Sequence, residues 1–173
     1  MTTQPDQHQD SAQAGVLALT TGGSIDKFYG RDGEMHIGSP CLSDLLAEAQ
    51  SQQLVDVVEV LRKDSLDLTA EDRSAIRDQI LGSSHKLVLI THGTDTMVDT
   101  AAALHDINDK TIILTGALQP RSMRHSDAAF NIGLALGALP RLPHGRYIAI
   151  NGQVQASHRV RKDPVLGRFV TLD

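Results

Sequence analysis

The sequence predicts an α/β fold in which a single open, mainly parallel sheet carries helices on both faces. Short apolar runs alternate along the chain with segments of helical periodicity, and polar turns separate them. The apolar runs lie at 16–19, 54–61, 87–90, 111–114 and 147–150. Strands that alternate with helices form parallel sheets through right-handed crossovers, so the pattern indicates a doubly wound, flavodoxin-like domain.

Length and composition indicate one soluble domain. The chain has 173 residues, enough for one domain with a real core and too few for two ordinary domains. Apolar residues make up 40% and charged residues 21%, as in soluble globular proteins, while aromatics contribute only 3%. We therefore expect residues 15–173 to form a single α/β domain with an aliphatic core, and residues 1–14 to be a disordered polar tail.

Composition also excludes several classes of partner and site. A net charge of -5 disfavours nucleic acid and anionic membranes as the main partners. Cys41 is the only cysteine and the eight histidines lack metal-ligand spacing, so we expect no disulfide, no metal and no cofactor. No apolar run approaches the roughly 20 residues that span a bilayer, and the N-terminal segment lacks signal-peptide features. These observations predict a cytoplasmic protein.

Local signals define the predicted helices. Ser39-Pro40 is read as the N-cap and first residue of one helix, and Thr69 with Asp72 resembles a capping box that opens the next. Ser126-Asp127 is expected to cap a later helix that runs to about Leu139. The positions expected to face the sheet are Leu42, Leu45, Leu46, Ala49, Ala75, Ile76, Ile80, Met97, Ala101 and Leu104.

Three further segments lie outside this strand–helix pattern. The glycine-containing stretch 25–38 is read as a mobile loop or a small hairpin. Asn151-Gly152 predicts a tight turn from the fifth strand into a short returning segment, 153–157. The basic segment Arg159 to Lys162 is read as the start of a C-terminal tail.

Hydroxyl-rich turns follow four of the predicted strands. They begin after Leu19, Leu61, Ile90 and Leu114. Because the carboxyl ends of parallel strands meet at one edge of the sheet, we expect these turns to converge there. The first N–H groups of the following helices lack partners and favour anionic groups. The sequence therefore predicts a site for a small carboxylate or amide.

Several side chains in these turns allow two interpretations. Thr21, between a strand and two glycines, is a nucleophile if a base is near, or a cap for the turn. Asp95, after Thr94, would bind an ammonium group or orient a base, or these two residues simply cap a helix. Ser65 is interpretable as a turn cap.

Three other residues are candidates for the same site. Tyr29, in a glycine-rich loop just past Thr21, is free to swing over a ligand or is an ordinary exposed loop tyrosine. Lys162 would ease deprotonation of a hydroxyl through its positive charge, or is a solvated lysine of the tail. His92 is interpreted as a packed turn residue rather than a ligand.

Taken together, the motifs resemble those of a known family. They are Thr21-Gly22-Gly23-Ser24-Ile25, Asp64-Ser65-Leu66-Asp67, Thr91-His92-Gly93-Thr94-Asp95-Thr96, and Gly116-Ala117-Leu118 with Ser126-Asp127 and Asn131. In this order, over roughly 16–162, they resemble the bacterial L-asparaginases. The length matches only the larger N-terminal domain of that family, so the chain resembles a short-chain L-asparaginase.

This resemblance implies hydrolysis of L-asparagine to L-aspartate and ammonia, with no cofactor. Thr21 matches the threonine that attacks the side-chain amide and becomes acylated, and Tyr29 is similar in place to a loop tyrosine that assists it. Thr94, Asp95 and Lys162 match a second constellation that supports proton transfer.

The resemblance also implies how the substrate is held. Ser65 and Asp95 match the groups that bind the α-carboxylate and α-ammonium, and the backbone of Ala117 would lie near the leaving amide. Backbone N–H groups beside Thr21 and Thr94, in the turns of Gly22 and Gly93, would form the oxyanion hole.

The chain departs from the family pattern in three respects. Leu66 stands where many members have a glutamine that helps bind the amino acid, and Ser24 replaces a usual threonine. Family members with a C-terminal domain complete the site with residues from a neighbouring subunit. We therefore expect weaker substrate binding and an obligatory homodimer or homotetramer.

Three alternatives remain beside this hypothesis. One is an ammonia-supplying glutamine or asparagine amidase subunit of a larger complex, and another is a non-catalytic amino-acid-binding module. The third is a phosphate- or nucleotide-binding α/β domain, which the absence of G-x-x-x-x-G-K-[ST] and G-x-G-x-x-G motifs disfavours.

Overall fold

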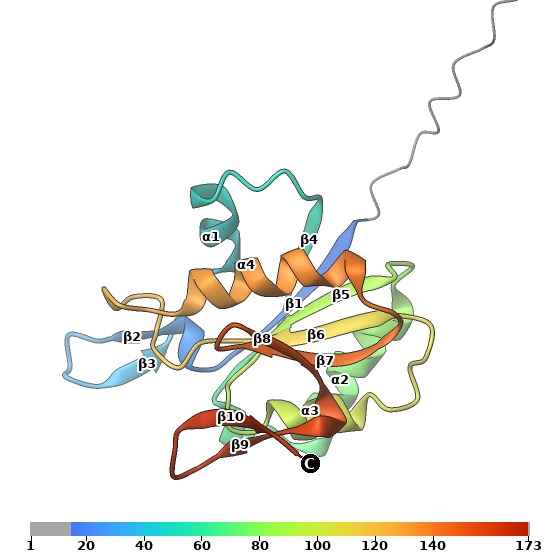
Figure 1. Cartoon of the computed structure of the whole chain (residues 1–173). Coiled ribbons are helices and arrows are strands. Elements are labelled where there is room, and N and C mark those ends of the chain that lie inside the picture. Colours follow the sequence, from blue (N-terminus) through green and yellow to red (C-terminus); the bar gives the residue numbers. More distant parts are fainter. Residues whose placement is uncertain (1–14, 173) are drawn as a thin grey trace, which may run out of the picture.

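A six-stranded sheet forms the centre of the molecule (Figure 1). The computed structural model describes residues 15–172, so the predicted tail at 1–14 lies outside the described residues. The strands are β1 (Val16–Gly22), β4 (Val55–Lys63), β5 (Leu87–Thr91), β6 (Thr111–Thr115), β7 (Gly145–Ile150) and β8 (Gln153–Ala156). Their order across the sheet is β4-β1-β5-β6-β7-β8, and only the pair β7–β8 is antiparallel. The five parallel strands thus stand in the order 2-1-3-4-5, which confirms the flavodoxin-like prediction.

Helices cover both faces of the sheet, as predicted for a doubly wound fold. The helices α1 (Leu42–Glu48) and α4 (Ala128–Ala138) pack on one face. The helices α2 (Ala70–Gly82) and α3 (Met97–Ala103) pack on the other. Among residues 15–172, no helix combines the length and the apolar character that crossing a bilayer requires.

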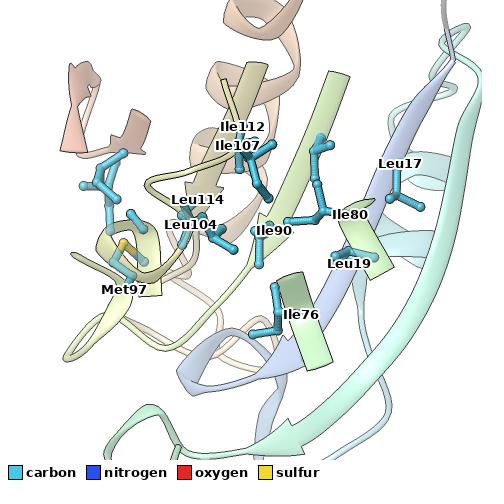
Figure 2. Close-up of a cluster of buried hydrophobic side chains, with 14 of the residues drawn as sticks. Leu17, Leu19, Ile76, Ile80, Ile90, Met97, Leu104, Ile107, Ile112 and Leu114 are labelled. Carbon is cyan, nitrogen blue, oxygen red and sulfur yellow. The ribbon is translucent and has the colours of Figure 1, made fainter. Parts of the chain in front are cut away.

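The two-sided burial explains why the central strands read as continuous apolar runs. In β1, Leu17 and Leu19 point to the layer of α2 and α3, whereas Val16 and Ala18 point to the layer of α1 and α4. Figure 2 shows the first of these clusters, in which Ile76 packs with aliphatic side chains of the strands.

Most of the predicted inward positions are buried. Leu42, Leu45, Ile76, Ile80, Met97, Ala101 and Leu104 are buried, Leu46 and Ala75 are half-buried, and Ala49 is exposed.

The capping predictions had different outcomes. The capping box at α2 is confirmed: the Thr69 hydroxyl accepts from the Asp72 N–H, and the Asp72 carboxylate accepts from the Thr69 N–H. The predicted start at Ser39-Pro40 is wrong, because α1 begins at Leu42. The N–H of Cys41, the N-cap of this helix, donates instead to the carboxylate of Asp26 at 2.8 Å. The acceptor of this N–H lies 15 positions earlier in the chain, so local spacing does not reveal it.

At α4, only one of the two predicted capping side chains caps the helix. The Ser126 hydroxyl accepts from the Ala128 N–H at 3.1 Å. The Asp127 carboxylate makes no capping bond and turns toward residues 118 and 119 instead.

Two hairpins lie outside the central sheet. The segment 25–38 folds as a short 3₁₀ turn followed by the hairpin of β2 (Lys27–Tyr29) and β3 (Met35–Ile37), which confirms the hairpin alternative. Within the central sheet, the predicted turn at Asn151-Gly152 joins β7 to β8 and is also confirmed, with φ values of 53° and 79°.

The second hairpin corrects the prediction of a basic tail. The segment that contains Lys162 is strand β9 (Val160–Asp163), which pairs with β10 (Arg168–Thr171). Val160 and Phe169 are 2% and 8% exposed, and both join the core cluster of α2 and α3. These two apolar side chains anchor the hairpin, and the surrounding charges hid that pattern.

The capping box yields a stability prediction. Replacing Thr69 by Ala leaves the Asp72 N–H without its side-chain acceptor, and should lower the free energy of unfolding by about 1 kcal/mol. Urea denaturation measures this change. The control is Ser74→Ala on the exposed face of the same helix, which should change stability by less than about 0.5 kcal/mol. Equal effects of the two substitutions would contradict the role of the cap.

Candidate active site

The candidate site lies at the carboxyl edge of the sheet, beside strands β1 and β5. Strand order reverses between these neighbours, because the chain leaves β1 toward β4 on one side and later leaves β5 toward β6 on the other. Such reversal points are where open α/β sheets bind ligands, since the following connections diverge to opposite faces and leave a crevice.

Glycine allows three turns to pack together at this edge. A Cβ atom on Gly23 would lie 2.4 Å from the Cα of Gly93, and one on Gly93 would lie 2.6 Å from the Ser65 hydroxyl oxygen. Gly22, with φ of 90°, packs as tightly against the backbone of Lys63. A larger residue at these positions would separate the turns, so the glycines bring the predicted hydroxyl groups to one place.

Thr21 is part of the sheet in this structure. β1 continues to Gly22, beyond the predicted end at Leu19, so Thr21 lies in the strand rather than in a turn. Its side chain is 1% exposed, and its hydroxyl donates to the carbonyl of Thr91 at 2.9 Å. This bond holds the hydroxyl at the junction of β1 and β5.

Lys162 makes the strongest polar contact of the site. Its ammonium group donates to the Thr94 hydroxyl at 2.8 Å and to the Asp95 carboxylate at 2.6 Å. These partners lie 68 and 67 residues earlier in the chain. The lysine is therefore not a solvated tail residue. A cation in this position stabilises negative charge on the adjacent hydroxyl oxygen.

Ser65 presents an unused hydroxyl group. The residue is 1% exposed, and its Oγ has no hydrogen-bond partner among the described residues. The Ser65 carbonyl accepts from the Thr96 hydroxyl at 2.7 Å, which fixes its turn beside α3. A buried hydroxyl without a partner is costly, so it is available to a ligand.

Two residues hold the turn at Ala117: Asp127, which directly precedes α4, and Asn131, which lies within α4. The Asp127 carboxylate accepts from the N–H groups of Leu118 and Gln119 at 3.1 and 2.9 Å. The Asn131 amide donates to the Gly116 carbonyl at 2.9 Å and accepts from the N–H of residue 151 at 3.1 Å. Ala117 itself is fully buried in this arrangement.

The positioning role of Asp127 and Asn131 is not among the sequence predictions. Both residues belong to the family motif, and Asp127 was interpreted only as a helix cap. Their spacing of four residues on one helix face, after a turn that begins with glycine, was the available signal.

Tyr29 lies outside the assembled group. It is on β2 of the hairpin that projects from the body of the molecule in Figure 1, and it is 70% exposed. Its hydroxyl lies near Gly33 at the hairpin turn, 3.6 Å from where a Cβ of that residue would be. Within residues 15–172, Tyr29 forms no side-chain hydrogen bond to Thr21.

His92 is buried beside the site, as the prediction of a packed turn residue requires. Its Nδ1 donates to the Gly93 carbonyl at 2.7 Å, so its neutral Nε2 accepts from the Thr100 hydroxyl at 2.8 Å. Removal from water disfavours the imidazolium form and lowers the pKa of His92 to about 4. Residues 15–172 contain no group of three or more His, Cys, Asp or Glu placed to hold a metal ion.

The fold and these contacts define a class of protein: a doubly wound α/β domain with threonine hydroxyls, a lysine and an aspartate at the switch point of its sheet. Residues 15–165 match the family model described as "Asparaginase, N-terminal". The chain belongs to this asparaginase family.

Relatives of two kinds are similar to the chain. A glutamyl-tRNA(Gln) amidotransferase subunit from Methanococcus vannielii is 30% identical over 151 residues, covering 80% of this chain and 34% of the relative. The L-asparaginase of Thermococcus kodakarensis is 29% identical over 161 residues, covering 88% and 48%.

Solved structures show the same relationship. The thermostable T. kodakarensis L-asparaginase superposes with a TM-score of 0.79 at 28% identity, covering 91% of this chain and 51% of that one. L-asparaginase I of Vibrio cholerae superposes with a TM-score of 0.81 at 25% identity, covering 92% and 52%. The chain therefore spans between a third and about half the length of these proteins.

The buried His92 predicts a pH dependence of stability. Histidine in the unfolded chain takes up a proton near pH 6.5, whereas His92 in the folded chain does so only at about pH 4. Between these values the unfolded state binds the extra proton, so the free energy of unfolding should fall as pH falls from 6.5 to 4. The contribution is at most about 1.4 kcal/mol per pH unit.

Urea denaturation at several pH values, compared with His92→Gln, isolates this contribution. The variant should show a shallower slope between pH 6.5 and 4.5 whatever its absolute stability. His125→Asn, at an exposed position, should keep the parental slope. Identical slopes in the parent and His92→Gln would exclude the buried neutral imidazole.

Proposed function

We propose that this domain hydrolyses the side-chain amide of L-asparagine through an acyl-enzyme on Thr21, releasing L-aspartate and ammonia. One observation carries the proposal: the ammonium group of Lys162 donates hydrogen bonds to both the Thr94 hydroxyl and the Asp95 carboxylate. Membership of the asparaginase family supports the same chemistry. A domain that only binds an amino acid has no need of a hydroxyl group activated in this way.

In the first step, the Thr21 oxygen attacks the amide carbon and the tetrahedral intermediate forms. The hydroxyl must leave the Thr91 carbonyl to do so, which requires only rotation about one side-chain bond. Collapse of the intermediate breaks the C–N bond and leaves an ester on Thr21. Water then hydrolyses the ester, which regenerates the hydroxyl and releases aspartate.

Thr94, Lys162 and Asp95 are proposed to carry the proton between these steps. The proton lost by the attacking hydroxyl has to reach the leaving nitrogen. The Thr94 hydroxyl takes up this proton as it gives its own proton to the nitrogen, so one proton is transferred in total and Thr94 is left unchanged. Asp95 balances the charge of Lys162, so that the pair remains neutral as the proton moves.

Free polar groups around these residues fit the remaining parts of the substrate. We assign the Ser65 hydroxyl to the α-carboxylate and the exposed side of Asp95 to the α-ammonium. In the described residues, the N–H groups of Gly93 and Thr94 have no acceptor, and they are suited to the developing oxyanion. The Gly22 turn and the Ala117 backbone are proposed to complete the binding surface.

Tyr29 enters this proposal only with movement of its hairpin. In the present arrangement its side chain is mostly in solvent, so assistance to Thr21 would require β2 and β3 to fold over the site. The expected homodimer or homotetramer and the cytoplasmic location also remain proposals. Because the relatives are longer, further substrate contacts in those proteins are expected to come from outside the matched region.

A second candidate is an ammonia-supplying amidase that serves a larger complex. Its support is the 30% identity, over 80% of this chain, to an archaeal protein named as an amidotransferase subunit. The two candidates share the chemistry of Thr21 and differ in substrate and coupling. Glutamine has one more methylene than asparagine, which pocket contacts discriminate by about 1–3 kcal/mol.

Ammonia release tests the proposal directly. The purified chain should release ammonia from L-asparagine, and Thr21→Val should reduce kcat by at least about 10²-fold through loss of the nucleophile. Thr20→Val is a matched control, because Thr20 is equally buried and its hydroxyl has no partner among the described residues.

Three outcomes decide between the candidates. Activity that survives Thr21→Val, or that falls equally in both variants, would refute Thr21 as the nucleophile. A preference for glutamine, with turnover that rises when a partner is added, would favour the amidase-subunit candidate. No turnover, with asparagine still raising the melting temperature, would leave a binding module.

The lysine has a separate test. Lys162→Met removes the cation that contacts the proposed proton carrier, the Thr94 hydroxyl. It should lower kcat by about 10²- to 10⁴-fold, the usual range for acid–base groups, with a smaller change in KM. Arg161→Met, at the exposed neighbouring position of β9, should retain parental kinetics. A change in KM alone would assign Lys162 to substrate binding instead.

A further inference from the structure

A cavity lies away from the candidate active site and is lined by several histidines. It has a volume of about 460 Å³ and lies between α3, the start of β7 and the 3₁₀ turn at Ser157–Arg159. His105, His144 and His158 line it, so three of the seven histidines in the described chain gather around one cavity. None of the residues proposed for catalysis contributes to its walls.

The lining of this cavity is rich in basic side chains. Arg146 lines it together with the three histidines, and no aspartate or glutamate is among the lining residues of the described chain. Tyr147 also lines it, but its hydroxyl is occupied by the carbonyl of Pro143 at 3.1 Å.

These basic side chains make few contacts that stabilise the fold. Within residues 15–172, the imidazoles of the three histidines make no hydrogen bond or ion pair. Arg146 uses one terminal nitrogen, which donates to the Ile107 carbonyl at 3.1 Å and more weakly to Asn108, and its other N–H groups remain available. Ser157 adds a hydroxyl to the lining.

We propose that this cavity binds a small, doubly charged oxyanion of the phosphate-ester class. A planar guanidinium group with free donors matches the geometry of a phosphate, and the imidazoles supply further donors around it. Val98, Ala101 and Ala102 of α3 provide an apolar wall for the organic part of such a ligand. The proposal is independent of the amidase function, because no residue is shared with that site.

The cavity should bind this ligand more tightly at lower pH. Histidine is the side chain that ordinarily changes charge between pH 5 and 8, and the three imidazoles share the cavity with one permanent cation. Lowering the pH therefore adds positive charge to the cavity. The Asp106 carboxylate, next to His105 but outside the lining, is bonded by Arg77.

Sulfate is the appropriate probe, because it stays doubly charged from pH 6 to 8 and any pH effect then comes from the protein. Calorimetric titration of the full chain with sulfate, at constant ionic strength set with chloride, should give saturable binding that is several-fold tighter at pH 6. His144→Asn and His158→Asn, at exposed positions, should each weaken this binding by about twofold to fivefold.

The control for charge alone is His125→Asn, at an exposed position outside the cavity, which should retain parental affinity at both pH values. Perturbation of the imidazole C–H resonances of His105, His144 and His158 by sulfate would locate the ion. Absence of saturable binding, affinity independent of pH, or equal weakening in all three variants would overturn the proposal. Ammonia release by the cavity variants should remain parental, which separates this test from that of the amidase.

Discussion

The close approach of three backbone turns is the constraint on which the candidate site depends. Gly23 contacts Gly93, and Gly93 contacts Ser65, at separations that leave no room for a Cβ atom. These contacts bring the carboxyl ends of β1, β5 and β4 together, so that hydroxyl groups from three distant segments meet. A parallel sheet places the strand ends on one edge, but only residues without side chains allow the turns to touch.

Burial gives the polar groups at this edge their chemical character. Thr21, Ser65 and Thr94 are each at most 3% exposed, so water screens their interactions weakly. The Thr94 hydroxyl meets the ammonium group of Lys162 from the buried side, whereas the Lys162–Asp95 pair is partly open to solvent. The same desolvation keeps His92 neutral, and its hydrogen bonds to Gly93 and Thr100 brace the turn that precedes Thr94. One buried environment thus both rigidifies this turn and keeps its histidine neutral.

Most of the fold was accessible from the sequence because its signals are local. The alternation of apolar runs with helical periodicity predicted the parallel strands and their doubly wound arrangement, and the Thr69–Asp72 spacing predicted a cap that the structure contains. The predictions that failed concern distant partners. Asp26 accepts from the N–H of the residue before α1, which begins later than Ser39 predicts, and Val160 with Phe169 anchors a charged segment as a hairpin.

The sequence by itself determined the succession of strands and helices, the hydroxyl-rich turns and the glycines in them, because these follow from periodicity and from the backbone conformations that each segment requires. Only the tertiary structure decided which hydroxyl Lys162 contacts, that Tyr29 is largely exposed, and that three histidines share a cavity with Arg146. Each of these arrangements joins residues from separate parts of the chain. Their distances depend on how whole elements pack, and no local pattern encodes that packing.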